Sequence, residues 1–129
     1  MRPPRIAPAV LCAALVPAAL AACGDTIDVA QSDPANVKRG AVLFQERCSG
    51  CHTLDAAGAQ GSKPRRTRTK SGERTNGPNF NQRKETPDNV LFAIRNGGFS
   101  GAIMPANIVV GRDAEDVAAF VAKYAGKQR

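Results

Sequence analysis

Apolar residues recur at helical spacing in three stretches of the chain. The first stretch begins at Asp33 and Pro34 and ends at Cys48. Its apolar or small face falls at positions i, i+3, i+4 and i+7, namely Val37, Gly40, Ala41 and Phe44. Asp33 is a typical N-cap residue, and proline is favoured at the first position of a helix. The pattern therefore predicts a helix that leads directly to Cys48.

The other two predicted helices lie in the second half of the chain. One begins at Thr86-Pro87-Asp88 and stops at Gly97, and the last begins at Asp113 and stops near Gly126. The expected inward faces are Val90, Leu91 and Ile94 in the former, and Val117, Phe120, Val121 and Tyr124 in the latter. No stretch alternates convincingly between apolar and polar residues at a period of two. The chain is therefore predicted to be all-α, with long connections between its helices.

The longest connection covers residues 58–77 and carries much of the charge of the chain. It contains six basic residues and one acidic residue, a net charge of +5, whereas the whole chain carries +7. Without large apolar residues it cannot bury a face, so a flexible loop is expected. Such a loop is either simply solvated, or docks an acidic partner or an anionic membrane surface. No nucleic-acid partner is expected, because the loop has no aromatic residue to stack on bases.

The first 22 residues resemble an export signal. Two arginines precede an uncharged, alanine-rich stretch at residues 6–22, and small residues end it. Leu20-Ala21-Ala22-Cys23 resembles the lipobox of bacterial lipoproteins, which implies lipid addition to Cys23 and cleavage just before it. A cleaved, soluble form and an uncleaved membrane helix are the alternatives. Two prolines count against the helix, since they interrupt a stretch at the short limit for spanning.

Cleavage before Cys23 leaves a chain long enough for one domain. Residues 23–33 show no periodicity and are expected to be a flexible tether between the lipid anchor and a domain at residues 34–126. The expected location is the outer face of the bacterial cytoplasmic membrane. Because Cys12 leaves with the signal, Cys48 and Cys51 are the thiols that remain, in a space that is kept oxidising.

Two thiols and one imidazole occur within five residues, Cys48 to His52, as Cys-Ser-Gly-Cys-His. A structural zinc site needs four ligands, and the chain has no second cluster of cysteine and histidine. A thioredoxin-like redox pair follows a strand, whereas a helix is expected here. A disulfide between Cys48 and Cys51 leaves His52 without a role. Covalent haem attachment uses all three residues and is the favoured interpretation, with His52 as an axial ligand of the iron.

Residues 37–124 resemble the class I c-type cytochromes, which are monohaem electron carriers. The motifs that carry the resemblance stand in the order of the family: Gly40 and Phe44, C-x-x-C-H, Gly77-Pro78-Asn79-Phe80, Met104-Pro105, and Asp116, Val117 and Phe120. The resemblance implies a small cytochrome c fold in which the N- and C-terminal helices cross, with Phe120 near Gly40 and haem as the core. One departure is the spacing between His52 and Pro78, which the basic loop lengthens.

The resemblance also implies roles for single residues around the haem. The carbonyl of Pro78 is expected to accept the Nδ1 proton of His52, and Met104 is expected to be the second axial ligand of the iron. A methionine at this position is otherwise an ordinary core residue. The expected haem-binding walls are Phe80, Leu91, Ile94 and Ile103.

The expected function is one-electron transfer between respiratory complexes by a monomer that catalyses no reaction of its own. Family resemblance suggests a quinol-oxidising cytochrome complex as donor and a terminal oxidase as acceptor, and the basic charge suggests acidic docking surfaces on redox partner proteins. Two other functions remain open. The chain is either a fixed haem subunit of a larger oxidoreductase, or a haem-based sensor or peroxidase if Met104 leaves the sixth position open.

Overall fold

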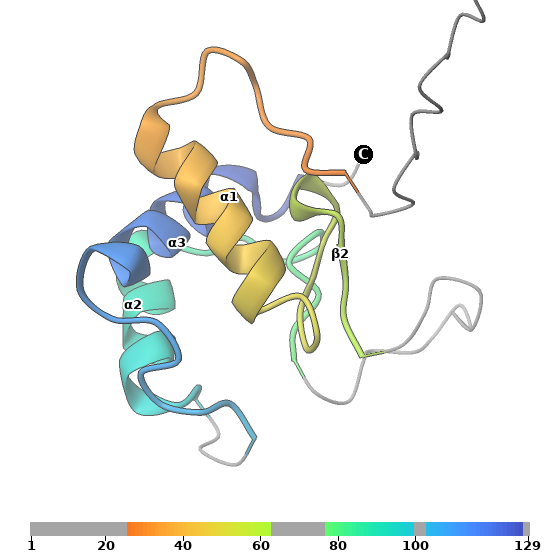
Figure 1. The fold of residues 1–129 in the computed structure, drawn as a ribbon. Coiled ribbons are helices and arrows are strands. Elements are labelled where there is room, and N and C mark those ends of the chain that lie inside the picture. Colours follow the sequence, from red (N-terminus) through yellow and green to blue (C-terminus); the bar gives the residue numbers. More distant parts are fainter. Residues whose placement is uncertain (1–25, 63–76, 100–102, 128–129) are drawn as a thin grey trace, which may run out of the picture.

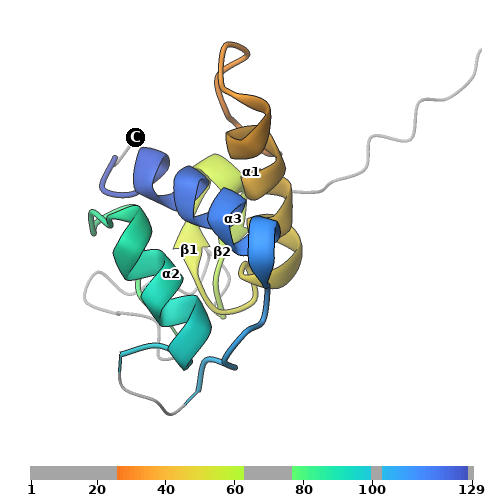
Figure 2. The ribbon, with the colours of Figure 1, turned by 90° about the vertical axis from the view of Figure 1, so that its left-hand side faces the viewer.

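The structure is a computed structural model, and it describes residues 26–62, 77–99 and 103–127. The elements along the chain are α1 (Ala35–Arg47), β1 (Thr53–Leu54), the 3-10 helix η1 (Asp55–Ala57), β2 (Ala59–Gln60), α2 (Pro87–Asn96) and α3 (Gly111–Tyr124). Helix α3 crosses α1 and packs against α2 as well (Figures 1 and 2). Within these described ranges, no helix has the length and hydropathy needed to cross a membrane.

The crossing of α1 and α3 depends on a glycine. A Cβ atom at Gly40 would lie 2.0 Å from the carbonyl oxygen of Asp116 and 2.9 Å from Cβ of Phe120, so no larger residue allows this approach. Arg39 forms an ion pair with the buried carboxylate of Asp116 across the crossing. The rings of Phe44 in α1 and Phe120 in α3 also pack against each other, with centroids 5.7 Å apart. The predicted contact between Gly40 and Phe120 is confirmed.

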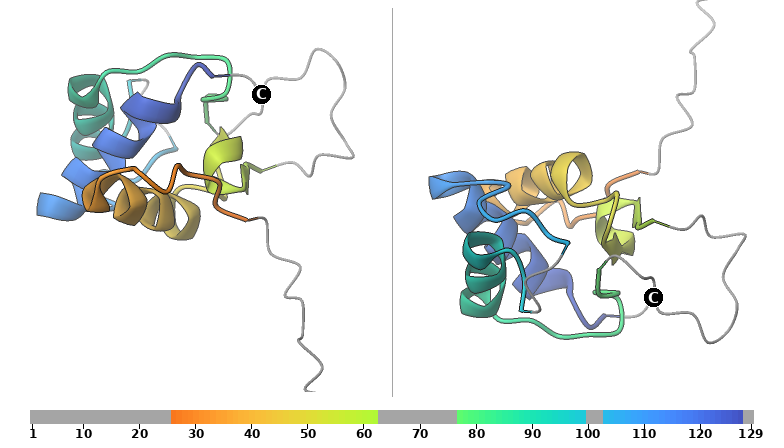
Figure 3. Two further views of the ribbon diagram at one scale, coloured as in Figure 1. Left: turned by 90° about the horizontal axis from the view of Figure 1, so that it is seen from above. Right: turned by 90° about the horizontal axis from the view of Figure 1, so that it is seen from below.

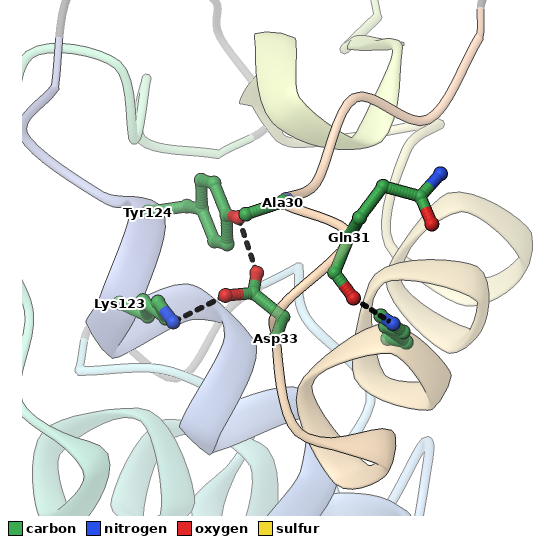
Figure 4. A network of polar contacts seen from close by, with 6 residues as sticks. Ala30, Gln31, Asp33, Lys123 and Tyr124 are labelled. Carbon is green, nitrogen blue, oxygen red and sulfur yellow. Dashed lines mark hydrogen bonds and ion pairs between the residues drawn. The ribbon is translucent and has the colours of Figure 1, made fainter.

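The start of α1 differs from the prediction. The N-cap residue is Pro34, and no side chain caps the helix. The carboxylate of Asp33 is buried and accepts hydrogen bonds from Lys123 and Tyr124 of α3 instead (Figure 4). The Tyr124 hydroxyl in turn accepts a hydrogen bond from the N–H of Ala30, at 2.8 Å. The prediction of Asp33 as N-cap was wrong, because charge-assisted partners from a distant helix outcompete the local backbone N–H groups.

Residues 26–33 lie against the domain. Ile27 and Val29 are partly buried and pack on the hydrophobic core. Between them, the N–H of Asp28 donates to the carbonyl of Ala56, at 2.9 Å. Over this stretch the structure differs from the flexible tether that was expected, because two apolar side chains separated by one residue suffice to seat a short extended segment. The left view of Figure 3 shows this segment, in orange, running beside η1 toward α1.

The two later helices form largely as predicted. The Thr86 hydroxyl accepts a hydrogen bond from the N–H of Asn89 at 3.2 Å, and Gly97 follows the last residue of α2 with a φ angle of +77°. Helix α3 begins at Gly111, two residues before the predicted start at Asp113. The buried side chains include the predicted ones Val90, Ile94, Val117, Phe120, Val121 and Tyr124, whereas Leu91 is only partly buried.

A short antiparallel sheet follows the cysteine motif. Thr53 of β1 lies opposite Gln60 of β2, and Leu54 lies opposite Ala59. The all-α prediction therefore needs correction, since the fold is mostly helical but contains this sheet. Strands of two residues cannot show an alternating pattern, and β2 falls within the expected basic loop. The greater part of that loop, residues 63–76, lies outside the described residues, as does the export signal at residues 1–22.

Candidate functional site

The described residues line a cavity of about 400 Å³ that brings most of the predicted site together. Its lining includes the predicted Cys48, His52, Pro78, Phe80 and Met104. A smaller cavity beside it is lined by Cys51 and again by Cys48, His52 and Met104. Two stretches far apart in the sequence, the cysteine motif and the methionine loop, therefore meet at one place. The predicted lipid-anchor residue, Cys23, lies outside the described residues.

The cysteine motif follows the end of α1 in a tight turn. The N–H of Cys48 donates to the carbonyl of Phe44 at 2.8 Å, and the N–H of His52 donates to the carbonyl of Cys48 at 2.9 Å. Cys48 and Cys51 form no disulfide in this structure. Burial, assisted by the charge of Cys51, raises the pKa of the Cys48 thiol to about 12. A redox dithiol needs a thiolate, so this environment does not favour that chemistry.

The ring of His52 is held on several sides. Its Nδ1 lies 3.4 Å from the carbonyl oxygen of Pro78, and the ring stacks on Phe80 with centroids 4.8 Å apart and an interplanar angle of 10°. Gly77 closes a further side, because a Cβ atom there would lie 2.9 Å from Nδ1 and from Cε1 of the ring. The position of the imidazole is therefore determined by packing.

Burial lowers the pKa of His52, and the hydrogen bond with the Pro78 carbonyl opposes that shift in part. The imidazole is therefore favoured in its neutral form. Since a carbonyl oxygen only accepts hydrogen bonds, the proton of the neutral ring is assigned to Nδ1. Nε2 then carries the lone pair, which is the form of histidine that binds a metal ion.

Met104 lies in the connection between α2 and α3. Its side chain is partly buried and packs against the hydrophobic core. Three residues further on, the N–H of Asn107 donates to the carbonyl of Ile94 in α2, at 2.7 Å. Of the four predicted wall residues, Phe80, Ile94 and Ile103 line the large cavity, although Ile103 is 61% exposed. Leu91 packs against the core and is not part of the lining.

The cavity wall also holds a charged pair that the sequence reasoning missed. Arg83 and Glu85 both line the cavity, and Nε of Arg83 lies 2.5 Å from Oε1 of Glu85. The Glu85 side chain is only 5% exposed, although most of the lining is apolar. No motif marks these residues. The available signal was their position between the Gly77-Pro78 motif and the start of α2.

This set of donors suits a large apolar ring that carries an iron ion and acidic groups. The walls are aromatic and aliphatic, one imidazole and one thioether line them, and Arg83 is a cation within the lining. Zinc is not favoured, since no three His, Cys, Asp or Glu side chains within the described ranges gather to hold a metal ion. The residues present therefore fit haem, with the two thiols available for thioether bonds.

The comparisons with known proteins agree with this chemistry. The family model described as cytochrome c matches residues 37–125. A similar solved structure is that of the c-type cytochrome SorU from Sinorhizobium meliloti, with 32% sequence identity and a TM-score of 0.55. The match covers 73% of this chain and 95% of that one. A comparison with curated proteins found no match. The chain therefore belongs to the cytochrome c family, as an electron-transfer protein that binds haem c covalently, with Cys48 and Cys51 supplying the C-x-x-C-H motif.

Proposed function

We propose that His52 and Met104 are the two axial ligands of the haem iron, and that the protein carries single electrons with both ligands in place. The observation that carries this proposal is that one cavity is lined by both residues, the single histidine of the chain and its last methionine. When bound, haem supplies a one-electron couple between ferric and ferrous iron, and a thioether ligand raises its reduction potential.

On the His52 side, the chain's part is to hold one nitrogen ready for the iron. The Pro78 carbonyl accepts the proton of Nδ1, which leaves Nε2 as the ligand atom. Phe80 and Gly77 restrict rotation of the ring through stacking and close packing. Ligand exchange and reorientation would slow electron transfer, so this rigid support suits a carrier.

The wall of the cavity has two further tasks. Arg83 is the cation that would meet the carboxylates of haem, and the ion pair with Glu85 holds its guanidinium in the lining. Buried apolar side chains such as Phe44, Val90 and Ile94 exclude water and lower the local dielectric constant. A dry, apolar environment favours the ferrous state, in which the site carries less net charge, and therefore acts in the same direction as the thioether.

The proposed location is the outer face of the cytoplasmic membrane, with the lipid on Cys23 as anchor. Its support is the charge and hydropathy pattern of residues 1–23. There the protein would carry electrons between respiratory complexes, and the basic stretch at residues 58–77 would steer it to acidic docking surfaces. Replacing Cys23 by Ser should move the protein from the membrane fraction to the soluble fraction. Retention in the membrane fraction would argue against the anchor.

The test of the axial ligands is a pair of visible spectra of the haem-loaded protein. Ferric wild type should show the far-red band of a sulfur–iron bond, and Met104→Ala should lack it. Val110→Ala is the matched control, because Val110 lies in the same connection between α2 and α3, is 63% exposed, lines neither cavity and should retain the band when shortened.

Two outcomes would favour other functions. Wild-type protein without the far-red band, whose ferrous form binds carbon monoxide rapidly, would have an open sixth position and would fit a sensor or a peroxidase. Wild-type protein with the band, but isolated only in a stable complex with a larger oxidoreductase, would be a fixed haem subunit of that enzyme. A monomer whose electron exchange slows with added salt fits the proposed carrier.

A further inference from the structure

The loop that carries Met104 rests on the C-terminal end of α2 through a contact that only glycine permits. The backbone at Gly97 has a φ angle of +77°, which residues with a side chain rarely adopt. A Cβ atom at Gly97 would also lie 2.7 Å from the carbonyl oxygen of Met104 and 3.4 Å from the nitrogen of Ala106. Both atoms belong to the backbone, so a larger residue at position 97 has to displace the loop itself.

A second contact fixes the same loop to the same helix end. The N–H of Asn107 donates to the carbonyl of Ile94 at 2.7 Å. This carbonyl belongs to the last turn of α2, where carbonyl groups lack partners within the helix. Asn107 reaches it with a φ angle of +57°, a conformation that asparagine tolerates better than most residues. The loop therefore contacts the helix on both sides of Ala106.

Helix α2 is itself well anchored, since Val90 and Ile94 are buried and the helix packs against α3. The loop thus takes its position from a rigid element, although several of its own side chains are exposed. We propose that Gly97 and Asn107 are positioning residues that seat Met104 on the end of α2 and thereby set how firmly its sulfur binds the iron. This inference deepens the proposed function and rests on it, because it requires Met104 to be the ligand.

The test measures how easily an added ligand displaces Met104. Imidazole is titrated into the ferric, haem-loaded protein, and the far-red sulfur–iron band is recorded. Gly97→Ala should lose much of the band and bind imidazole at least about tenfold more tightly than wild type, because the iron is open in a larger fraction of the molecules.

The matched control is Gly111→Ala. Gly111 also has a positive φ angle, +56°, but a Cβ atom there would meet nothing within 4 Å. This substitution introduces the same kind of backbone strain without the clash, so its imidazole affinity should stay within about twofold of wild type. The comparison separates seating of the loop from a general loss of stability.

Asn107 provides a second route should Gly97→Ala fail to fold. The residue is exposed, so substitution there leaves the core unchanged. Asn107→Val disfavours the left-handed conformation and should increase imidazole affinity, whereas Asn107→Gly favours it and should keep the wild-type affinity.

If Gly97→Ala and Asn107→Val match wild type in band and affinity, the positioning role is refuted and Met104 remains the ligand. If wild type itself lacks the band and binds imidazole as tightly as Met104→Ala, the proposed ligation fails, and this inference fails with it.

Discussion

The two sides of the cavity are built in different ways. The His52 side is formed by packed side chains, since the ring stacks on Phe80, touches Gly77 and lies near Phe44 within the core. The Met104 side is a loop held by backbone contacts to the end of α2, and its neighbour Ile103 is 61% exposed. Substitutions on the first side should therefore cost folding stability, whereas substitutions on the second should change the ligation more than the stability.

The largest expected effect follows from Phe44, the residue that joins the His52 side to α3. It is 1% exposed, and its ring packs against Phe80 and Phe120, with centroids 6.1 and 5.7 Å away. Phe44→Ala should lower the free energy of unfolding by about 3–5 kcal/mol, because it leaves a cavity among three rings. Urea unfolding of the haem-loaded protein measures this change.

Phe92→Ala is the matched control for Phe44→Ala. Phe92 lies on α2 and is 49% exposed, so its loss should cost no more than about 1 kcal/mol. Equal costs for the two substitutions would contradict the view that the His52 side is the tightly packed one.

The next largest effect concerns the contact between Gly77 and His52. Gly77→Ala would place a Cβ atom 2.9 Å from the imidazole and 3.0 Å from the carbonyl oxygen of Cys51, so the ring or the backbone must shift. Overpacking of this kind costs about 1–3 kcal/mol. The unfolding free energy should fall by that amount, and the reduction potential should change because the ring is displaced.

Gly50→Ala is the control here, since Gly50 lies in the cysteine motif, two residues before His52, and a Cβ atom there meets nothing within 4 Å. It should change stability by no more than about 0.5 kcal/mol. If Gly77→Ala keeps the reduction potential and the unfolding free energy of wild type, this contact does not hold the imidazole in place.

The sequence predicted local features of the molecule better than it predicted contacts between distant segments. Local signals sufficed for the cysteine motif, for the ends of α2 at Thr86 and Gly97, and for the close approach at Gly40. Each depends on a backbone conformation or a missing side chain that one residue type supplies. The sequence also pointed to Met104, but it gave no reason for the exact position of the loop.

Contacts between distant segments account for what the sequence did not predict. Asp33 has the residue type of an N-cap, but its partners Lys123 and Tyr124 come from the far end of the chain. Arg83 and Glu85 form part of the site only because the chain after Gly77-Pro78 folds over the cavity. Neither pairing leaves a periodic pattern, so no reading of local sequence finds it.

A smaller effect is expected at the start of α2, the end of the helix that lies away from Met104. The Thr86 hydroxyl accepts a hydrogen bond from the N–H of Asn89. Thr86→Ala should lower the unfolding free energy by about 1 kcal/mol, because that N–H loses its partner, and Thr86→Ser should restore most of it. The far-red band should be unchanged in both variants. Loss of the band in Thr86→Ala would mean that Met104 responds to any weakening of α2, and not specifically to its C-terminal end.

The smallest effect concerns the buried carboxylate of Asp33, which connects residues 26–33 to α3. Hydrogen bonds from Lys123 and then from Tyr124 lower the pKa of Asp33 below its ordinary value. A carboxyl with a lowered pKa in the folded state contributes stability above its unfolded pKa of about 3.9 and loses that contribution as the pH falls through the folded value. Because the Lys123 side chain is 42% exposed, solvent screens the ion pair and keeps the effect small.

The pKa of Lys123, a partner of Asp33, shifts in the opposite direction, which adds a prediction at high pH. The hydrogen bond with Asp33 raises the pKa of Lys123, so the contribution of the ammonium is complete below its unfolded pKa of about 10.4 and disappears as the pH rises through the folded value. The urea midpoints of wild type and Asp33→Asn should therefore differ most near pH 6, and should converge both as the pH falls below about 4 and as it rises above about 10.4. Throughout this range the far-red band of the two proteins should stay the same at equal pH. A difference in the band would mean that the contacts of Asp33 with α3 affect the ligation of the iron. The two sides of the cavity would then not be independent.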